Sequence, residues 1–589
     1  MNAQHPPHSS LLGTVVNHLS LVYVDLSEQS IQQLAGSLIN IMRLDDQQDD
    51  HPLRDNFWRE SDVWLITYAN SIYASDNTPP LKTLKDFVDT KLGEVVTGVH
   101  LLPFYPSTSD GGFAVQDYRA IDPDFGDWDD VEAMTERYTV MGDCVVNHCS
   151  ASHQWFINYQ EDRKPGADYF IEASTKDDLS DVVRPRVTAL LKDVKKAGET
   201  KHVWCTFGHD QVDLDFSNPK VLEEVISLLR FYLDKGIRAF RLDAIAFIWK
   251  EIGTSCINLP QTHELIRLMR TLVSAARHDA IIITETNVPN VENLMYFGNA
   301  NEAHAVYNFA LPPLLLYGLM FGTSEPIMKW QSSMPPAQKG TFYFNFIASH
   351  DGIGLRPAEN LLTRDQVDRM IGVAQMFGGR VSSRTTPEGN SKPYELNIAL
   401  FDAFLGSAEG VDGYQLQRFI CAHAIMFALE GLPGIYIHSF LGTQNNYQGV
   451  EDTGEKRAIN RYRWNEDELE ESLASPRSHH LKTLAALKNL LTIRKSQPAF
   501  HPNAMQFTLR VGDKLFGFMR QSMDRKQTIF CLNNMTRTSQ DIPLSSLNLT
   551  AIQAWRDLIG GESFDDLDAV ITLKPYQSIW LANSEQPSH

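Results

Sequence analysis

Acidic side chains fall at the ends of successive apolar runs in this chain. Asp243, Glu285 and Asp351 each close such a run. Acidic groups beside buried strands are costly unless they are paired or used. Two carboxylates on neighbouring strands suit glycoside chemistry, because one can attack an anomeric carbon while the other protonates the leaving oxygen. These residues therefore indicate a retaining glycoside-active site.

Neighbouring residues should set the protonation of these carboxylates. Arg241 stands two residues before Asp243 on the same strand face, so we expect it to keep Asp243 ionised as a nucleophile. We expect crowding by Asp243 and Asp351 to raise the pKa of Glu285, which then starts protonated, as an acid must. Taken singly, each carboxylate is equally compatible with a paired structural role. Their arrival at consecutive strand ends favours catalysis.

The elements that must position these residues are short apolar runs separated by longer helical patterns. Asn218 can cap one such helix, Pro219 suits its first turn, and Gly236 ends it. Alternation of this kind predicts an α/β fold with a parallel sheet, and eight runs predict a (β/α)8 barrel. The runs begin at Val63, Val96, Val140, Ile237, Ile281, Ala305, Tyr343 and Gly434.

The remaining segments predict additions to this barrel. We expect a helical extension over 1–58, a catalytic barrel over 59–502 and a β-domain, sandwich or sheet, over 503–589. Long intervals at about 150–215 and 352–414 follow the third and seventh strands, so they should be insertions that roof the site. The second contains a Gly-, Ser-, Pro- and Arg-rich stretch, 378–395, that we expect to be a mobile loop.

Composition excludes several kinds of partner. The 589 residues include 52 Lys and Arg against 73 Asp and Glu, a net charge of −21 that disfavours nucleic acids and anionic membrane surfaces. Six cysteines form no C-x-x-C pair, which favours reduced thiols in a cytoplasmic protein. We find no signal peptide and no unbroken membrane span.

Four segments resemble the signature segments of the alpha-amylase-like retaining glycoside hydrolases. They are GDCVVNH ending at His148, RLDAIAF around Asp243, ITETN around Glu285 and ASHDG around Asp351. The resemblance implies that Asp243 is the nucleophile, Glu285 the acid/base and Asp351 the transition-state stabiliser. It also implies glucose contacts from Arg241, His148 and His350.

A narrower resemblance extends from about residue 58 along almost the whole chain. GVHLLPFYPSTSDGGF, VVRPRV, FALPPLLL, KPYELN and EDTGEKRAINR are similar to the sucrose-phosphorylase subfamily, which transfers glucose to phosphate instead of water. The resemblance implies that Asp110 grips the distal glucose hydroxyls between apolar walls. It further implies a phosphate site, because a dianion needs cations beside the glucosyl-enzyme. The walls are Phe113 and Phe207, and the phosphate residues are Arg186, Tyr394 and Arg461, the last also reaching glucose.

The acceptor side departs from sucrose phosphorylases. Asn287 replaces a histidine after the acid/base, and Glu395 replaces a glutamine after the loop tyrosine. Both positions are expected at the acceptor site. The segments ETNVPN, SHDGIGL and IYIHSFLGTQNNYQGVE look most like glucosylglycerate phosphorylases and secondarily like sucrose 6-phosphate phosphorylases. Both acceptors are anions, so a loop cation among Arg380, Arg384 and Lys392 is a candidate partner.

The expected reaction is phosphorolysis of a small α-glucoside, best 2-O-α-glucosylglycerate, to α-glucose 1-phosphate. Alternatives are a sucrose or sucrose 6-phosphate phosphorylase, an α-glucoside hydrolase or transglucosylase, and a non-enzymatic binding member. We expect no cofactor and no metal, since no additional acidic cluster accompanies Asn147, near which amylases often bind calcium. The oligomeric state stays open, with a homodimer as one alternative.

Overall fold

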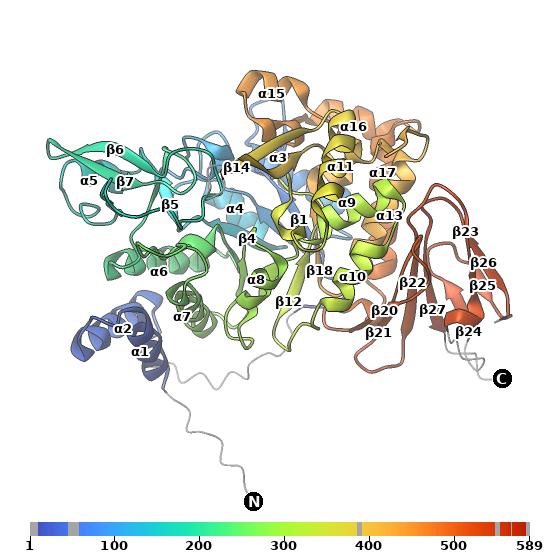
Figure 1. Cartoon of the computed structure of the whole chain (residues 1–589), viewed down its shortest axis with the longest axis horizontal. Coiled ribbons are helices and arrows are strands. Elements are labelled where there is room, and N and C mark those ends of the chain that lie inside the picture. Colours follow the sequence, from blue (N-terminus) through green and yellow to red (C-terminus); the bar gives the residue numbers. More distant parts are fainter. Residues whose placement is uncertain (1–9, 45–57, 386–390, 548–553, 567, 585–589) are drawn as a thin grey trace, which may run out of the picture.

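A closed barrel of eight parallel strands forms the centre of the molecule (Figure 1). The computed structural model describes residues 10–44, 58–385, 391–547, 554–566 and 568–584. Each of the eight predicted apolar runs overlaps one barrel strand, so the predicted barrel is confirmed. In chain order the strands are β1 (Trp64–Thr67), β3 (Gly98–Leu101), β4 (Thr139–Cys144), β9 (Ala239–Leu242), β10 (Ile281–Thr284), β11 (Ala305–Tyr307), β12 (Phe342–Asn345) and β18 (Leu432–Tyr436).

Strand register brings the predicted catalytic residues to one level. Leu242 of β9 pairs with Thr284 of β10, so Asp243 and Glu285 leave adjacent strands side by side. Arg241 pairs with Asp143 of β4 on the other flank. Parallel strands end at the same face of a barrel, and this face carries the catalytic groups.

Helices surround the barrel. In α6 (Pro219–Asp234), the Asn218 side chain accepts from the Lys220 amide, and Gly236 takes a positive φ of 87° after the end, as the sequence predicted. Other helices of the barrel and its flanks are α3 (Pro80–Phe87), α4 (Trp128–Thr135), α7 (Pro260–Ala276), α8 (Asn290–Leu294), α9 (Leu311–Phe321), α10 (Glu325–Ser333), α13 (Gln415–Ala428), α14 (Ile437–Leu441), α16 (Glu466–Ala474) and α17 (His479–Arg494).

Two inserted segments rise above the catalytic face. The first holds β5 (His148–Ser150), α5 (Gln154–Gln160), β6 (Leu191–Lys196), β7 (Glu199–Trp204) and β8 (Gln211–Asp213). The second holds β13 (Ile353–Gly354), α11 (Arg364–Met376), β14 (Arg380–Thr385), β15 (Ser391–Asn397) and α12 (Leu400–Ala403). Most of the stretch predicted as a mobile loop is an antiparallel ribbon of β14 and β15, joined to β13 as a three-stranded sheet. Residues 386–390 of that prediction lie outside the described residues.

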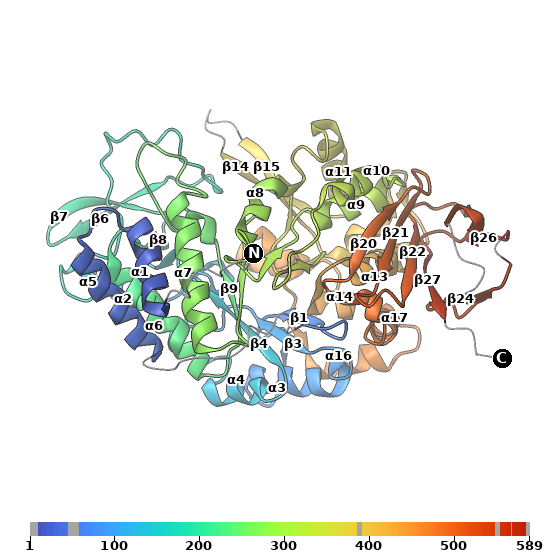
Figure 2. The ribbon, with the colours of Figure 1, turned by 90° about the horizontal axis from the view of Figure 1, so that it is seen from below.

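The amino-terminal helices and the carboxyl-terminal strands lie at opposite ends of the molecule (Figures 1 and 2). Near the amino end, α1 (Leu11–Val22) packs on α7 and α2 (Glu28–Met42) on α6. His18 Nδ1 lies 2.5 Å from Glu264 Oε1, and the Tyr23 hydroxyl donates to the Phe216 carbonyl across 3.0 Å. These contacts dock the helices on the barrel wall.

The carboxyl-terminal part forms a β-domain with its own apolar core. Its six-stranded sheet has the order β20-β21-β22-β27-β24-β25, and β23 pairs with β26 beside it. The strands are β20 (Met505–Leu509), β21 (Leu515–Gln521), β22 (Thr528–Asn534), β23 (Gln540–Pro543), β24 (Ala554–Asp557), β25 (Ser563–Phe564), β26 (Val570–Leu573) and β27 (Ser578–Ser584). Among the described residues no helix is long and apolar enough to cross a membrane.

Candidate active site

A cavity opens at the carboxyl ends of the barrel strands and collects most of the predicted site residues. Eleven of them line it: Asp110, Phe113, His148, Arg186, Phe207, Asp243, Glu285, Asn287, His350, Asp351 and Tyr394. Arg241, Glu395 and Arg461 do not, although each contacts a residue that does. Segments more than 280 residues apart thus meet around one space, as Asp110 and Tyr394 show.

Arg241 forms ion pairs with three carboxylates at the strand ends. Its Nη1 lies 2.8 Å from Asp243 Oδ1 and also pairs with Asp143, while its Nη2 is 3.9 Å from Glu285 Oε2. Asp143 is further held by His100 Nε2 at 2.8 Å. Because Arg241 is only 3% exposed, water screens these interactions little.

Burial changes what was expected of Asp243. Removal from water raises the pKa of the Asp243 carboxyl well above its ordinary value, and the lowering effect of Arg241 does not cancel this. The sequence-based expectation that Arg241 keeps Asp243 ionised left out this cost of burying a carboxylate, against which Arg241 acts. The charge of Glu285 adds to the increase, so these two neighbouring carboxyls compete for protons.

Geometry decides which member of the pair holds the proton. Burial and the charge of Asp351 raise the pKa of Glu285. Arg241 contacts Asp243 directly but stands 3.9 Å from Glu285, so its charge favours an anionic Asp243. The Ala244 amide donates to Glu285 Oε2 at 3.0 Å, which leaves Oε1 to carry a proton. The contact of Arg241 with Asp243 therefore favours an anionic Asp243 beside a protonated Glu285, the state that the predicted roles of nucleophile and acid require.

Asp351 has the opposite environment. Burial acts to raise its pKa, but the guanidinium groups of Arg457 and Arg461 more than offset this and lower the pKa of Asp351. Arg457 Nη1 lies 2.6 Å from Asp351 Oδ1. Sequence reasoning missed Arg457, although it stands within EDTGEKRAINR four residues before Arg461. Arg457 lies within the short 3₁₀ segment Lys456–Asn460 and Arg461 directly follows it, and that spacing was the available signal.

The wall opposite the catalytic carboxylates is suited to a sugar ring. Asp110 Oδ2 accepts from Gln211 Nε2 at 3.1 Å, and the same amide reaches His148 Nε2 at 3.1 Å. Phe113 stacks on His350 with ring centres 5.1 Å apart. Carboxylate and imidazole groups can bind the hydroxyls of a sugar, and flat apolar surfaces can pack against its ring faces.

Cations stand at the side of the cavity beyond Glu285. Arg186 lies over the rings of Phe207 and Tyr394, 5.7 Å from each centre. Arg356, which the sequence reasoning did not select, also lines the cavity and is half-buried. Within the described ranges no carboxylate forms an ion pair with either arginine. Asn287 Oδ1 is buried there without a hydrogen-bond partner among the described residues.

The loop cations predicted for the acceptor lie elsewhere. None of Arg380, Arg384 and Lys392 lines the cavity. Arg384 Nη2 pairs with Glu359 at 3.1 Å, and Arg380 donates to the Gly378 carbonyl. Folding of this stretch into a ribbon points these side chains away, so Arg356 is the better-placed cation.

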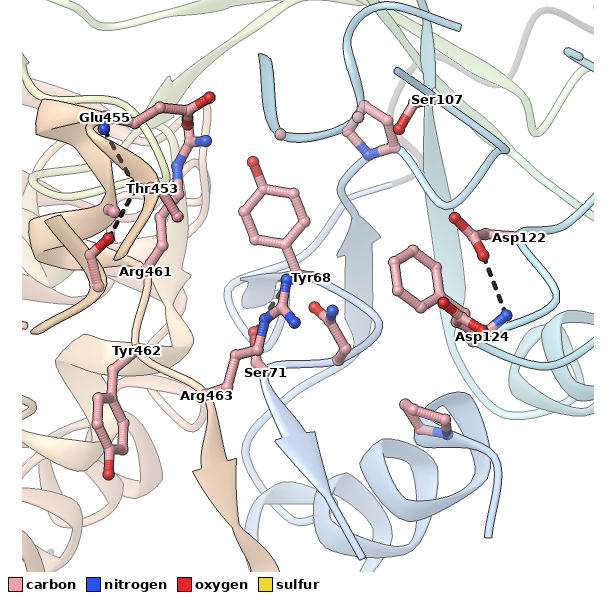
Figure 3. A pocket seen from close by; sticks show the side chains of 18 of the residues that line it. Tyr68, Ser71, Ser107, Asp122, Asp124, Thr453, Glu455, Arg461, Tyr462 and Arg463 are labelled. Carbon is pink, nitrogen blue, oxygen red and sulfur yellow. Dashed lines mark hydrogen bonds between the residues drawn. The ribbon is translucent and has the colours of Figure 1, made fainter. Parts of the chain in front are cut away.

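Arg461 occupies a wall between two spaces. Its Nε donates to the His350 carbonyl at 2.8 Å, and its Nη2 is 3.9 Å from Asp351 Oδ1. It lines a second, more open cavity of about 880 Å³ together with Tyr68 and Ser107 (Figure 3). Arg461 therefore lies between the backbone at His350 and the second cavity, whereas Arg186 lines the first.

A lysine occupies a position that could otherwise attract a cation. Lys250 Nζ is 2.6 Å from Asn147 Oδ1 and 2.7 Å from Asp213 Oδ2, and its side chain is 3% exposed. Asp213 also accepts from the Thr206 amide at 2.9 Å. In the part of the chain that the structure describes, no group of three or more His, Cys, Asp or Glu could hold a metal ion.

Comparison with known proteins agrees with this geometry. The alpha-amylase catalytic domain matches residues 90–351, and the maltogenic amylase C-terminal domain matches residues 505–580. A glucosylglycerate phosphorylase of Allomeiothermus silvanus is 40% identical over 90% of this chain and 92% of its own. Another, of Escherichia coli K12, is 38% identical over 94% and 96%.

More distant relatives act on other glucosides by name. A sucrose phosphorylase of Streptococcus mutans is 30% identical over 74% of this chain and 88% of its own. The crystal structure of a sucrose 6F-phosphate phosphorylase from Thermoanaerobacter thermosaccharolyticum has a TM-score of 0.71 at 25% identity, covering 82% of this chain and 96% of that one.

Proposed function

Because the chain belongs to the glucosylglycerate phosphorylase family, whose catalytic domain is of the alpha-amylase type, we propose that it phosphorolyses 2-O-α-glucosylglycerate to α-glucose 1-phosphate and glycerate. The chain is a glycoside phosphorylase. Support for an anionic acceptor comes from Arg186 and Arg356, two cations that line the cavity beside the catalytic carboxylates without an ion pair to any described residue.

The first step forms a glucosyl-enzyme. Asp243 attacks C1 of the glucosyl group, the bond from C1 to the glycerate oxygen breaks, and Glu285 gives that oxygen its proton. Positive charge that develops at the ring is stabilised by Asp351, whose lowered pKa keeps it anionic. Glycerate leaves with the proton, and Glu285 becomes a carboxylate.

The second step transfers glucose to phosphate. An oxygen of hydrogen phosphate attacks C1 from the face that glycerate vacated, the bond to Asp243 breaks, and Glu285 recovers a proton from the phosphate. Two inversions give net retention, so the product is α-glucose 1-phosphate. Phosphate and glycerate bind in turn on the same side of C1, and both are anions. Arg186 and Arg356 can therefore serve both.

The same residues suggest how glycerate is distinguished from a sugar. A carboxylate fits the fork of Arg356, and an acceptor hydroxyl can donate to the unpartnered Oδ1 of Asn287. A neutral acceptor would leave Arg356 without a counter-charge. We infer that selectivity lies in this pair.

We propose that the reaction needs no metal or cofactor, with phosphate as a co-substrate; Lys250 places a positive charge next to Asp213. We further propose a cytoplasmic location. All six cysteines are buried free thiols, as is usual in a reducing compartment.

One assay separates the candidate acceptors. α-Glucose 1-phosphate is offered with glycerate, fructose, fructose 6-phosphate or glycerol, and phosphate release is followed. We expect glycerate to react fastest. A faster reaction with fructose 6-phosphate would favour the sucrose 6-phosphate alternative, and glucose release at the same rate without any acceptor would indicate a hydrolase.

Arg356→Ala tests the anionic contact, with Arg384→Ala as the matched control outside the cavity. We expect Arg356→Ala to raise the KM for glycerate by about tenfold or more, which is the usual cost of a lost charged hydrogen bond. The KM for glycerol should change less. Equal effects of the two substitutions would contradict the role of Arg356.

A further inference from the structure

Glu395 is fully engaged although it does not line the catalytic cavity. It lies on β15, the middle strand of its sheet, and is 1% exposed. Its Oε1 accepts from Arg457 Nε at 2.9 Å and from the Gly352 amide at 2.9 Å. Its Oε2 accepts from Arg457 Nη2 at 2.7 Å. These three hydrogen bonds all come from two neighbours of one residue, Asp351.

Arg457 carries this arrangement into the cavity. Two of its nitrogens are held by the bidentate contact with Glu395, and the third, Nη1, lies 2.6 Å from Asp351 Oδ1. A planar guanidinium held at two points has one orientation, so its remaining donor is fixed in direction. Glu395 thereby determines where the cation beside Asp351 points.

Gly352 forms the second link. It follows Asp351 directly, and its amide donates to Glu395. A Cβ added at Gly352 would lie 2.4 Å from Glu395 Cγ, which shows how closely the backbone approaches this side chain. A side chain at position 352 would therefore displace Glu395 from this contact.

From this geometry we propose that Glu395 is a positioning residue that fixes the carboxylate of Asp351 through Arg457 and Gly352, and that it does not contact the acceptor. The inference rests on the proposed function only in taking Asp351 as the stabiliser of the glucosyl transition state. It replaces the sequence-based expectation of an acceptor contact. The glutamine of sucrose phosphorylases would keep the shape of this side chain but lose its charge.

Glu395→Gln tests the proposal because glutamine presents one oxygen and one NH₂ group to the Arg457 fork, so a donor then faces a donor. Two donors are compared, α-glucosyl fluoride, which contains no acceptor, and α-glucose 1-phosphate with glycerate. We expect kcat with both donors to fall by about tenfold or more, while the KM for glycerate changes less than about twofold. A raised KM for glycerate with an unchanged rate from α-glucosyl fluoride would overturn the proposal.

Further variants separate positioning from stability. Glu359→Gln removes a carboxylate from the partly exposed pair with Arg384 in the same inserted segment and should leave both rates unchanged. Arg457→Lys should itself lower kcat with both donors. Adding Glu395→Gln should lower kcat little further, because both substitutions break the same contact between Arg457 and Glu395. Additive losses would contradict the coupling.

If Glu395→Gln does not fold, Glu395→Asp serves instead, since it keeps the charge but withdraws it by one methylene. The same pattern, a lower kcat with an unchanged KM for glycerate, is expected. A change confined to that KM would overturn the proposal. Because α-glucosyl fluoride needs no glycerate, the outcome is readable even if the wild-type enzyme prefers a different acceptor.

Discussion

The guanidinium of Arg241 donates to the Asp243 carboxylate across 2.8 Å, from two residues earlier in the chain. Only Oδ1 of Asp243 takes part in this contact, so Oδ2 remains available to attack a substrate. The full charge of Arg241 is needed because burial by itself makes an anionic Asp243 costly. This pair is the physical basis of the proposed nucleophile.

Asp243→Asn should abolish activity without unfolding the protein. An amide of the same size keeps a hydrogen-bonding oxygen near Arg241 but cannot form the glucosyl ester. We expect phosphorolysis to fall by roughly 10³-fold or more, with an unchanged circular dichroism spectrum. A well-folded variant that retains more than a few per cent of the rate would exclude Asp243 as nucleophile.

Glu285→Gln should distinguish substrates by their need for an acid. Glycerate is a poor leaving group without a proton, so phosphorolysis of glucosylglycerate should fall by about 10² to 10⁴-fold. α-Glucosyl fluoride needs no proton on its leaving fluoride, so its rate of glucosyl-enzyme formation should fall much less. Equal losses with the two donors would argue against Glu285 as the acid.

The raised pKa of Glu285 gives a pH dependence of defined sign. The acid acts only when protonated, so kcat for glucosylglycerate should decline as pH rises through the pKa of Glu285. Because burial and Asp351 move that pKa upward, the decline should begin at a higher pH than for an ordinary glutamate. A pH–rate profile of the wild type against α-glucosyl fluoride, which should lack this decline, provides the check.

Arg186→Ala should weaken phosphate binding selectively. Arg186 stands between two aromatic rings and lines the cavity, so its loss removes a cation from the phosphate side. We expect the KM for phosphate to rise by about tenfold or more, with hydrolysis of the glucosyl-enzyme little changed. Arg461→Ala is the comparison, and it should slow both reactions because Arg461 contacts the His350 carbonyl. Parallel losses in the Arg186 variant would refute a phosphate role.

Lys250→Met should destabilise the fold. It removes the ammonium group 2.7 Å from Asp213 and leaves the fully buried Asp213 carboxylate without the positive charge of Lys250. Breaking such a pair costs about 3–5 kcal/mol, to be measured by urea unfolding. Lys220→Met is the control, because the Lys220 pair with Glu223 is surface-exposed on the lysine side and should contribute little. A loss within about 1 kcal/mol of that control would show that Lys250 is not needed to balance Asp213.

Several features of the site followed from the order of residues alone. The eight apolar runs predicted the barrel, and the residues closing them predicted that Asp243, Glu285 and Asp351 would share one face, because parallel strands of similar length must end together. By contrast, the ribbon of β14 and β15 was expected as a loop. Its polar residues lack the alternation of a half-buried strand, and β15 also pairs with β13, from which α11 separates it in the chain.

The sequence by itself determined which residues have the chemical groups for this reaction and the strand ends from which they project. Only the tertiary structure decided that Arg457 points at Asp351, that Glu395 pairs with Arg457 and that burial raises the pKa of Asp243. The reason is physical. Charge interactions and desolvation vary over a few ångströms, and the distances between segments far apart in the chain are set by how loops close over the barrel.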